Sequence, residues 1–156
     1  AKTVNPEKNL QNITFALTTN WQTDEIIELY RAGGWWEMGW NQNGIAPLMK
    51  GSYLFLIAID TTTKSAVGMG RLIADGTSDA YFQDISVLPE YRTRGIGREI
   101  VRVLRNLGKA YGLSWMGIIA APKKENFYLR QGFSPMPDYT PMLLDEKRPN
   151  RYHDTQ

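Results

Sequence analysis

The sequence of 156 residues contains no cysteine and a single histidine. Without cysteine the chain forms no disulfide, offers zinc no thiolate and has no thiol nucleophile. The histidine, His153, stands in the polar stretch at the carboxyl end. We therefore expect neither a Ser-His-Asp triad nor a histidine metal centre, and we predict that no metal takes part. Acid–base chemistry has to rely on tyrosine, carboxylates, lysine or bound water.

Long apolar runs and an excess of charge of one sign are also missing. The longest apolar run, Tyr53–Ile59, suits a buried strand and falls far short of the roughly 20 residues that span a bilayer. Ala1–Leu10 lacks the apolar stretch of a signal peptide. The net charge of +2 does not favour general nucleic-acid binding. Since missing cysteine also suits a reducing compartment, we expect a cytoplasmic protein without membrane or nucleic-acid partners.

What the chain does contain is a regular succession of apolar segments. No repeat or linker divides it, so we predict a single domain over residues 1–156, with a polar tail from about 145 to 156. The predicted elements, in order, are a strand at 13–17, a helix capped by Thr23 or Asp24 and ended by Gly33, an aromatic cluster at 35–40 in or before a short helix, strands at 53–60, 66–74 and 80–88, a helix at 94–111, a strand at 114–120, a helix at 123–131 and a strand at 142–144.

This order of elements predicts a mixed α/β sheet with helices on both faces. Three consecutive strands favour antiparallel hairpins, and the central strand–helix–strand step favours a parallel, right-handed crossover. The helix at 94–111 has one apolar face, with Ile96, Ile100 and Leu104 among its members. Its other sides carry Arg98, Arg102, Arg105 and Lys109, which we interpret as a solvated basic surface.

The segment 87–97, between a strand and this helix, carries two glycines, Gly95 and Gly97. Glycine lets a ligand approach the backbone, and the first amides of a helix lack helical partners and lie at its positive end. With Arg92, Arg94 and Arg98 around it, this turn is a candidate phosphate cradle. Tight packing is the alternative interpretation. A dinucleotide fingerprint and a Walker loop are both absent.

Two motifs resemble the GCN5-related N-acetyltransferases (GNAT). Arg-x-x-Gly-x-Gly at 92–97, preceded by Val-x-Pro-x-Tyr at 87–91, resembles the acetyl-CoA-binding motif of that family. Asn-Phe-Tyr at 126–128, followed by Gly-Phe at 132–133, resembles its second signature. The order of elements is similar over most of the chain. The resemblance implies a mostly antiparallel GNAT sheet whose central parallel strands, the fourth and fifth, splay apart to admit acetyl-CoA.

The resemblance also implies cofactor contacts. Backbone amides at 92–97 would hold the pyrophosphate, Ile85 and Val87 would lie along the pantetheine arm, and Asn126 would hydrogen-bond the cofactor. The full set of expected cofactor-binding residues is Ile85, Ser86, Val87, Arg92, Thr93, Arg94, Gly95, Ile96, Gly97, Arg98, Asn126 and Tyr128.

For catalysis the resemblance implies direct attack of an amine on the thioester in a ternary complex. Tyr128 would protonate the leaving sulfur, since a phenol with a pKa near 10 is protonated at neutral pH; a core aromatic is the alternative. A fourth-strand amide near Ile85 would stabilise the oxyanion. Relatives that acetylate polyamines use a Glu-Asp pair as base. Here Gln83 cannot take a proton, and Asp84 is a candidate base, directly or through water, or a salt-bridge partner. Alternation predicts that Asp84 faces away from Gln83 and Ile85.

The acceptor wall is expected in the first helices. Tyr30, Trp35, Trp36 and Glu37, together with Gln83, are the candidate substrate-binding residues, since aromatic rings with a carboxylate suit a cationic or aromatic amine. Core packing of the tryptophans is the alternative. The hypothesis is an acetyl-CoA-dependent N-acetyltransferase acting on a small-molecule or peptide amine, with a homodimer compatible with the family. The alternative is a CoA-binding sensor or partner-binding module without turnover.

Overall fold

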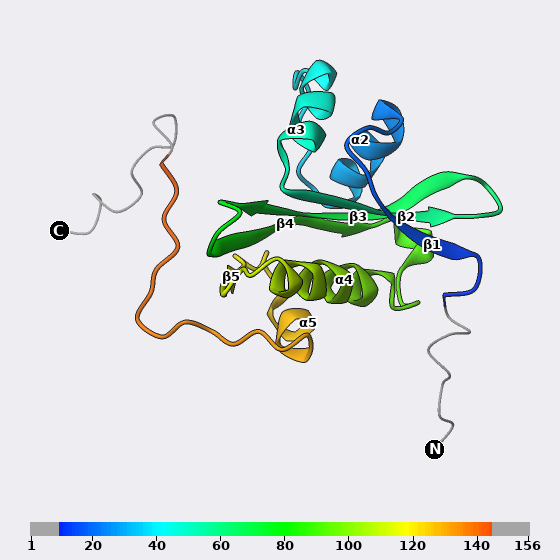
Figure 1. Ribbon diagram of the computed structural model, residues 1–156. Helices are drawn as coiled ribbons and strands as arrows, with labels where there is room; N and C mark the ends of the chain where they lie inside the picture. The colour runs from blue at the N-terminus through cyan, green and yellow to red at the C-terminus, as the bar shows by residue number, and fades with distance from the viewer. Residues whose placement is uncertain (1–9, 145–156) are drawn as a thin grey trace.

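The structure is a computed structural model that describes residues 10–144, so the predicted polar tail lies outside the described residues. The described chain forms a five-stranded sheet with strand order β1-β2-β3-β4-β5 (Figure 1). In chain order the elements are β1 (Ile13–Leu17), α2 (Thr23–Ala32), a 3₁₀ turn (Gln42–Gly44), α3 (Ile45–Gly51), β2 (Leu54–Asp60), β3 (Ser65–Ala74), β4 (Asp79–Val87), a 3₁₀ turn (Pro89–Tyr91), α4 (Ile96–Ala110), β5 (Trp115–Gly117) and α5 (Glu125–Arg130).

The strand directions confirm the mixed sheet that the sequence predicts. β1, β2, β3 and β4 pair antiparallel in succession, and β5 pairs parallel to β4 after the α4 crossover. The strand predicted at 114–120 is confirmed as β5, but it is shorter and covers only Trp115–Gly117. The strand predicted at Met142–Leu144 is wrong. These residues form no strand, and no neighbouring strand offers them the ladder hydrogen bonds that hold so short a segment.

Helices cover both faces of the sheet, as predicted. Figure 1 shows α2 and α3 on one face and α4 with α5 on the other. Strand β2 is apolar from Leu54 to Ile59 because its side chains alternate between two cores. Leu56 and Ala58 pack in the core under α4, whereas Phe55 and Ile57 pack in the core under α2 and α3.

The start of α2 differs from the prediction. Its N-cap is Gln22, without a capping side-chain hydrogen bond, so neither Thr23 nor Asp24 caps the helix. Glu25 fixes this end instead. Its carboxylate accepts hydrogen bonds from the Trp21 indole and, at 3.1 Å, from the backbone amide of Ala66 at the start of β3. The acidic first turn also suits the positive end of the helix dipole.

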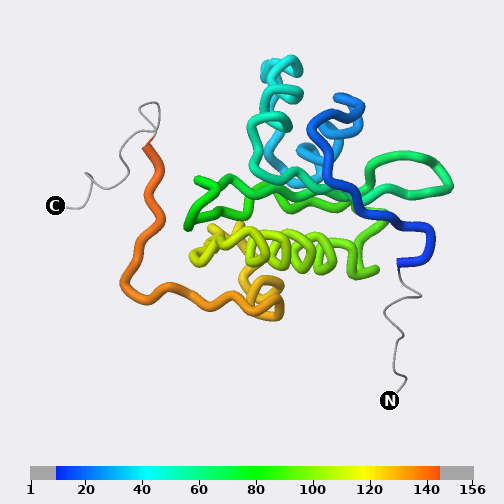
Figure 2. Tube along the Cα trace, viewed as in Figure 1, coloured from blue at the N-terminus to red at the C-terminus, as the bar shows by residue number. Residues whose placement is uncertain are grey.

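Helix α4 packs closely against β3 at Gly70. A Cβ at Gly70 would lie 2.6 Å from both Ile100 of α4 and Ile85 of β4, so only glycine fits there. The trace in Figure 2 shows the chain passing from β4 through a tight loop into α4. No helix within residues 10–144 is long and apolar enough to cross a membrane.

Candidate active site

Strand β4 contains a β-bulge at the centre of its pairing with β3. Between the β3 residues Met69 and Arg71, β4 contributes one residue more than a regular ladder requires. Asp84 lies at this point with a φ of 57°, a left-handed conformation in which aspartate is enriched over most residues. Asp84 and Ile85 therefore have no partner in the β3 register. Bulges of this kind re-aim side chains and interrupt pairing next to active sites.

The bulge changes which side chains share a face. Gln83 is the register partner of Arg71, and Arg71 contacts Asp84, so all three lie on the face covered by α2 and α3. The prediction that Asp84 faces away from Gln83 is wrong, because one inserted residue shifts the alternation. The prediction that Asp84 and Ile85 face opposite sides is confirmed. Ile85 points toward Gly70 and α4.

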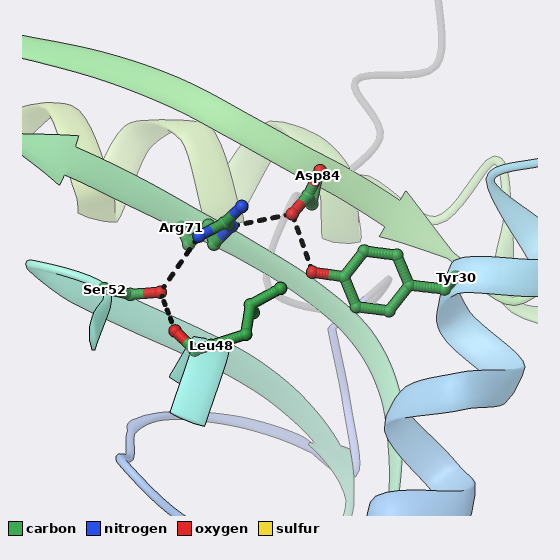
Figure 3. Close-up of polar contacts among 5 residues, drawn as sticks. All are labelled: Tyr30, Leu48, Ser52, Arg71 and Asp84. Carbon is green, nitrogen blue, oxygen red and sulfur yellow. Dashed lines mark hydrogen bonds and ion pairs between the residues drawn. The ribbon is translucent and has the colours of Figure 1, made fainter. Parts of the chain in front are cut away.

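On the α2 side of the bulge, Asp84 is the centre of a polar cluster (Figure 3). The Tyr30 hydroxyl of α2 donates to Oδ2 of Asp84 at 2.7 Å, and Nε of Arg71 donates to the same oxygen at 2.6 Å. Arg71 also donates to Ser52 Oγ at 3.4 Å, and the Ser52 hydroxyl donates to the Leu48 carbonyl at 2.7 Å. The cluster thus joins α2, α3, β3 and β4.

Burial controls the chemistry of this cluster. The Arg71 and Asp84 side chains are 15% and 16% exposed, so their ion pair is only weakly screened by solvent. Burial of Tyr30, followed by the negative charge and hydrogen bond of Asp84, raises the pKa of its hydroxyl well above the usual range. Tyr30 therefore keeps its proton at neutral pH and acts as a hydrogen-bond donor to Asp84. Both donors bond to Oδ2, and no hydrogen bond from the described residues goes to Oδ1, which leaves Oδ1 available to an amine or a water molecule.

The sequence interpretation did not single out Arg71. It lies among apolar residues of β3 with no motif around it, and only the β3–β4 register brings it to Asp84. One signal was present. An arginine in the interior of a buried strand needs a partner, since charged groups are rarely buried unpaired.

The last residue pair between β4 and β5 is Tyr81 with Gly117, so the strands part just before the bulge. On the α4 side of this opening, a row of rings leads from β4 to Tyr128 on α5. Phe82 contacts Phe133 at 5.2 Å between centroids, and Phe133 contacts Tyr128 at 5.7 Å. The phenol therefore lies beside the opening, on the face opposite Asp84.

Tyr128 is a packed aromatic residue that also borders a groove. Its ring packs against the core under α4, and the residue also lines a groove of about 330 Å³ together with Ile118 and Ala120, which follow β5. Burial raises the pKa of the Tyr128 hydroxyl to about 12, so it carries its proton at any physiological pH. Asn126 is exposed on the same short helix.

The predicted phosphate cradle is a glycine turn leading into α4. Gly95 is the N-cap and has a φ of 87°, which favours glycine. The first helical hydrogen bond runs from the Glu99 amide to the Gly95 carbonyl at 3.0 Å, so the amides of Ile96, Gly97 and Arg98 precede it. A Cβ at Gly95 would meet nothing within 4 Å, so the space beside this glycine is open.

Two cradle arginines hold the loop in place. The Arg92 guanidinium donates to the carbonyls of Val87 at 3.1 Å and Ala32 at 3.0 Å, and that of Arg94 donates to the Gln11 carbonyl at 3.0 Å. The Arg92 amide bonds to Pro89, and the Thr93 hydroxyl bonds to the Arg92 carbonyl. Arg98 is exposed at the start of α4, on the cradle itself.

The remaining cofactor candidates of β4 divide between the two faces. Ser86 is buried, and its hydroxyl donates to the Leu29 carbonyl of α2 at 2.7 Å. Its side chain therefore holds β4 against α2. Val87 faces α4 and would lie 3.7 Å from a Cβ at Gly97. Ile85 and Val87 thus lie on one face, as predicted for residues along a single ligand.

Next to Tyr30 is a pocket of about 390 Å³ between the α2 end and α3, a volume typical of small-molecule sites. Tyr30 and Trp36 line it, and so does Trp40, which packs edge-on against Trp36 at 5.7 Å. Trp35 lies outside the lining, and both Trp35 and Trp36 pack against the core under α2, as the core alternative predicted. Glu37 is exposed and outside the lining. The lining carries no charged side chain; its members are Tyr30, Trp36, Gly39, Trp40, Asn41, Gly44, Ile45 and Leu48.

The chain is similar in sequence and in fold to known acetyltransferases. An uncharacterized N-acetyltransferase of Porphyra purpurea is 23% identical over 129 residues, 83% of this chain and 74% of that protein. A GNAT family acetyltransferase of Streptococcus pneumoniae has a TM-score of 0.66 at 27% identity, covering 87% of this chain and 99% of that one. An aminoglycoside N-acetyltransferase in complex with CoA has a TM-score of 0.66 at 14% identity, covering 87% and 95%.

The fold is therefore that of an acetyltransferase. The sequence model of the acetyltransferase (GNAT) domain matches residues 51–135, more than half of the chain and the whole of the segment from β2 to α5. The chain belongs to the GNAT family and is an N-acetyltransferase. Acetyl transfer from acetyl-CoA is the general reaction of that family.

Proposed function

We propose that the protein transfers the acetyl group of acetyl-CoA directly to the amine of a small molecule with an apolar or aromatic body, both substrates being bound together. The bulge of β4 carries this proposal. At one point of one strand it combines two residues without a register partner, Asp84 and Ile85, with the contacts that Tyr30 and Arg71 make to Asp84, just beyond the last β4–β5 residue pair.

The residues present fit acetyl-CoA, which supplies an activated acetyl thioester. The free amides of Ile96, Gly97 and Arg98, with the exposed Arg98 guanidinium, hold the pyrophosphate at the positive end of α4. Ile85 and Val87 flank the pantetheine arm on the α4 face of β4. The side chains of Arg92 and Arg94 act indirectly, by fixing the loop that presents the amides.

Three groups near the bulge share the chemistry. A bulge amide at Ile85 stabilises negative charge on the acetyl oxygen. Oδ1 of Asp84 accepts the proton of the amine, directly or through water, while Tyr30 and Arg71 hold the other oxygen. Tyr128, from the opposite face, protonates the departing sulfur. The proposed acid and the proposed base therefore approach the acetyl group from opposite faces of β4.

The acceptor pocket supports the substrate class. Aromatic rings and aliphatic side chains without a charged group favour an apolar body over a polycation. Tyr30 belongs both to this lining and to the polar cluster, so an acceptor in the pocket has its amine directed toward Asp84.

Release of CoA thiol in the presence of an amine panel tests the acceptor class. We expect kcat/KM for phenethylamine to exceed that for spermidine at least about tenfold, the effect of roughly 1.4 kcal/mol of apolar contact. Trp40→Ala should raise KM for phenethylamine with little change in kcat. The control Tyr53→Ala, an exposed aromatic outside the pocket, should not. A preference for spermidine would contradict the apolar acceptor.

Thermal unfolding with and without acetyl-CoA tests the cradle. A ligand that binds only the folded state raises Tm. Gly97→Val should abolish that rise because its side chain is directed at Val87 and Phe127, beside the proposed path of the pantetheine arm. Its Cβ meets Phe127 at an ordinary 3.5 Å, so the fold should survive. Gly51→Val, where a Cβ meets nothing within 4 Å, is the matched control. Binding of acetyl-CoA without turnover of any amine would instead support the sensor hypothesis.

A further inference from the structure

The loop that leads into α4 contains a strained residue. Thr93 has a φ of 65°, and a β-branched residue adopts a positive φ only at a cost in energy. Such a conformation persists where the surrounding structure holds the chain in place. The helix amides of the cradle, at 96–98, begin three residues later, so their position depends on contacts that keep this loop from relaxing.

One such contact comes from the end of β2. The Tyr91 hydroxyl donates a hydrogen bond to Oδ2 of Asp60 at 2.7 Å. Tyr91 belongs to the 3₁₀ turn at the start of the loop, and Asp60 is the last residue of β2, 31 positions earlier in the chain. Asp60 lies outside both sequence motifs, so the motifs assign it no part in cofactor binding.

Asp60 is itself held in place. Its Oδ1 accepts a hydrogen bond from the Thr62 amide at 2.8 Å. The amide of the next residue along from Asp60, Thr61, donates to the Asn12 carbonyl just before β1, also at 2.8 Å. The hydrogen bond from Tyr91, followed by that from Thr62, lowers the pKa of the Asp60 carboxyl, which is therefore ionised at neutral pH. Hydrogen bonds to an ionised acceptor are stronger than those between neutral groups, so the Tyr91 hydroxyl has a strong acceptor in a fixed position.

The ring of Tyr91 carries this contact further along the loop. The Arg94 guanidinium lies 5.8 Å from the centroid of the Tyr91 ring, within the range of a cation–π contact. Arg94 directly precedes Gly95, the N-cap of α4, and the ring of Tyr91 also packs against the core under α4. Asp60, Tyr91 and Arg94 therefore form a continuous series of contacts from the end of β2 to the start of the helix.

We propose that Asp60 is a positioning residue for acetyl-CoA: through Tyr91 it keeps the strained loop in the conformation that presents the α4 amides to the pyrophosphate. This inference rests on the proposed function, in which those amides hold the pyrophosphate. A binding site that is already ordered does not lose affinity to the cost of ordering it. Loss of the Tyr91–Asp60 bond therefore weakens binding through the pyrophosphate and not through the pantetheine arm.

Isothermal titration calorimetry with CoA, and with CoA in competition with pantetheine, tests this role, because pantetheine lacks the pyrophosphate. We expect the parent to bind CoA more tightly. In Tyr91→Phe and in Asp60→Ala, the preference for CoA over pantetheine should fall about tenfold, the effect of about 1.4 kcal/mol. The double variant should lose no more than either single variant, since all three lack the same bond.

Matched variants separate positioning from a general loss of stability. Tyr91→Phe keeps the ring, so its packing and its contact with Arg94 survive and the variant should fold. Asp60→Asn retains an oxygen that accepts from Tyr91, and it should keep most of the preference for CoA. Asp75→Ala removes the carboxylate of the turn between β3 and β4, far from the cradle in sequence, and should leave the preference unchanged.

Two outcomes overturn the proposal in distinguishable ways. A parent that prefers CoA while Tyr91→Phe keeps the full preference, or weakens both ligands equally, would refute the positioning role alone. A parent that binds pantetheine as tightly as CoA would refute the pyrophosphate cradle of the proposed function, and the role of Asp60 with it.

Discussion

The hydroxyl of Tyr30 donates a 2.7 Å hydrogen bond to Asp84, which lies 54 residues further along the chain. This contact joins α2, which helps to form the acceptor pocket, to the bulge of β4. Asp84 is held from a second direction by Arg71, at 2.6 Å. The carboxylate is therefore fixed in place before any substrate arrives, which is the condition for an effective catalytic group.

Breaking the Arg71–Asp84 pair should destabilise the fold. We expect Arg71→Met and Asp84→Asn each to lower the free energy of unfolding by about 2 kcal/mol, because each leaves a largely buried charge without its partner. The double variant should cost clearly less than the sum. Urea unfolding measures all three. Arg31→Met, which removes an ion pair with Glu28 whose side chains are both 56% exposed, is the control and should change stability by less than about 0.5 kcal/mol.

Tyr128→Phe should keep acetyl-CoA binding, since the ring contacts with Phe127 and Phe133 survive. It should lower kcat by about 100-fold, within the range for loss of one general acid. Because that loss arises in the transition state, kcat/KM should fall by the same factor. Tyr111→Phe, an exposed tyrosine on the far end of α4, should have no effect. Unchanged turnover in Tyr128→Phe would show that the phenol is only a packing group.

Alkaline pH should destabilise the protein through Tyr30 and Tyr128. Burial raises the pKa of both hydroxyls in the folded state, that of Tyr128 to about 12, while the unfolded chain ionises near 10. The stabilisation is therefore complete below pH 10 and is lost as the pH rises toward the folded values. Thermal unfolding followed from pH 9 to 11 should show Tm falling less steeply in Tyr128→Phe than in the parent. An equal slope would contradict the raised pKa.

The β3–β4 hairpin should show the opposite dependence, through Asp75. Hydrogen bonds from the backbone amides of Ser78, Thr77 and Asp79 lower the pKa of its carboxyl in the folded state. Its stabilising effect is present above the unfolded pKa of about 3.9 and is lost as the pH falls through the lower folded value. Asp75→Ala should lower Tm at pH 7, and the difference from the parent should shrink as the pH drops below 4. A difference that stays constant down to pH 2 would count against this role.

The sequence predicted most of the architecture because local signals agreed with the fold. The long apolar run of β2, the periodic face of α4 and the glycines that end α2 and precede α4 each determine an element from nearby residues alone. The strand predicted at Met142–Leu144 was wrong because a β-strand needs a partner, and three apolar residues in a row do not reveal whether one is available.

The candidate site was only partly predictable for the same reason. The glycine cradle and Tyr128 lie in motifs that are continuous in sequence. The Arg71–Asp84 pair depends on a register that changes at the bulge, and a bulge leaves little trace in a single sequence beyond an aspartate able to adopt a positive φ. Trp36 and Trp40 line the pocket and Trp35 does not, although Trp35 and Trp36 both pack against the core under α2. Spacing does not reveal this division in an irregular loop.

The extra residue of β4 reverses which side chains of the strand face α4. Before it, even-numbered side chains such as Phe82 face α4; after it, odd-numbered ones such as Val87 do. Deleting Asp84 would therefore do more than remove a carboxylate. It would turn the rest of the strand over, directing Ser86 away from Leu29 and Val87 away from the cradle. Evolution can exchange the residue at this position, but it cannot change the number of residues there without rebuilding both layers.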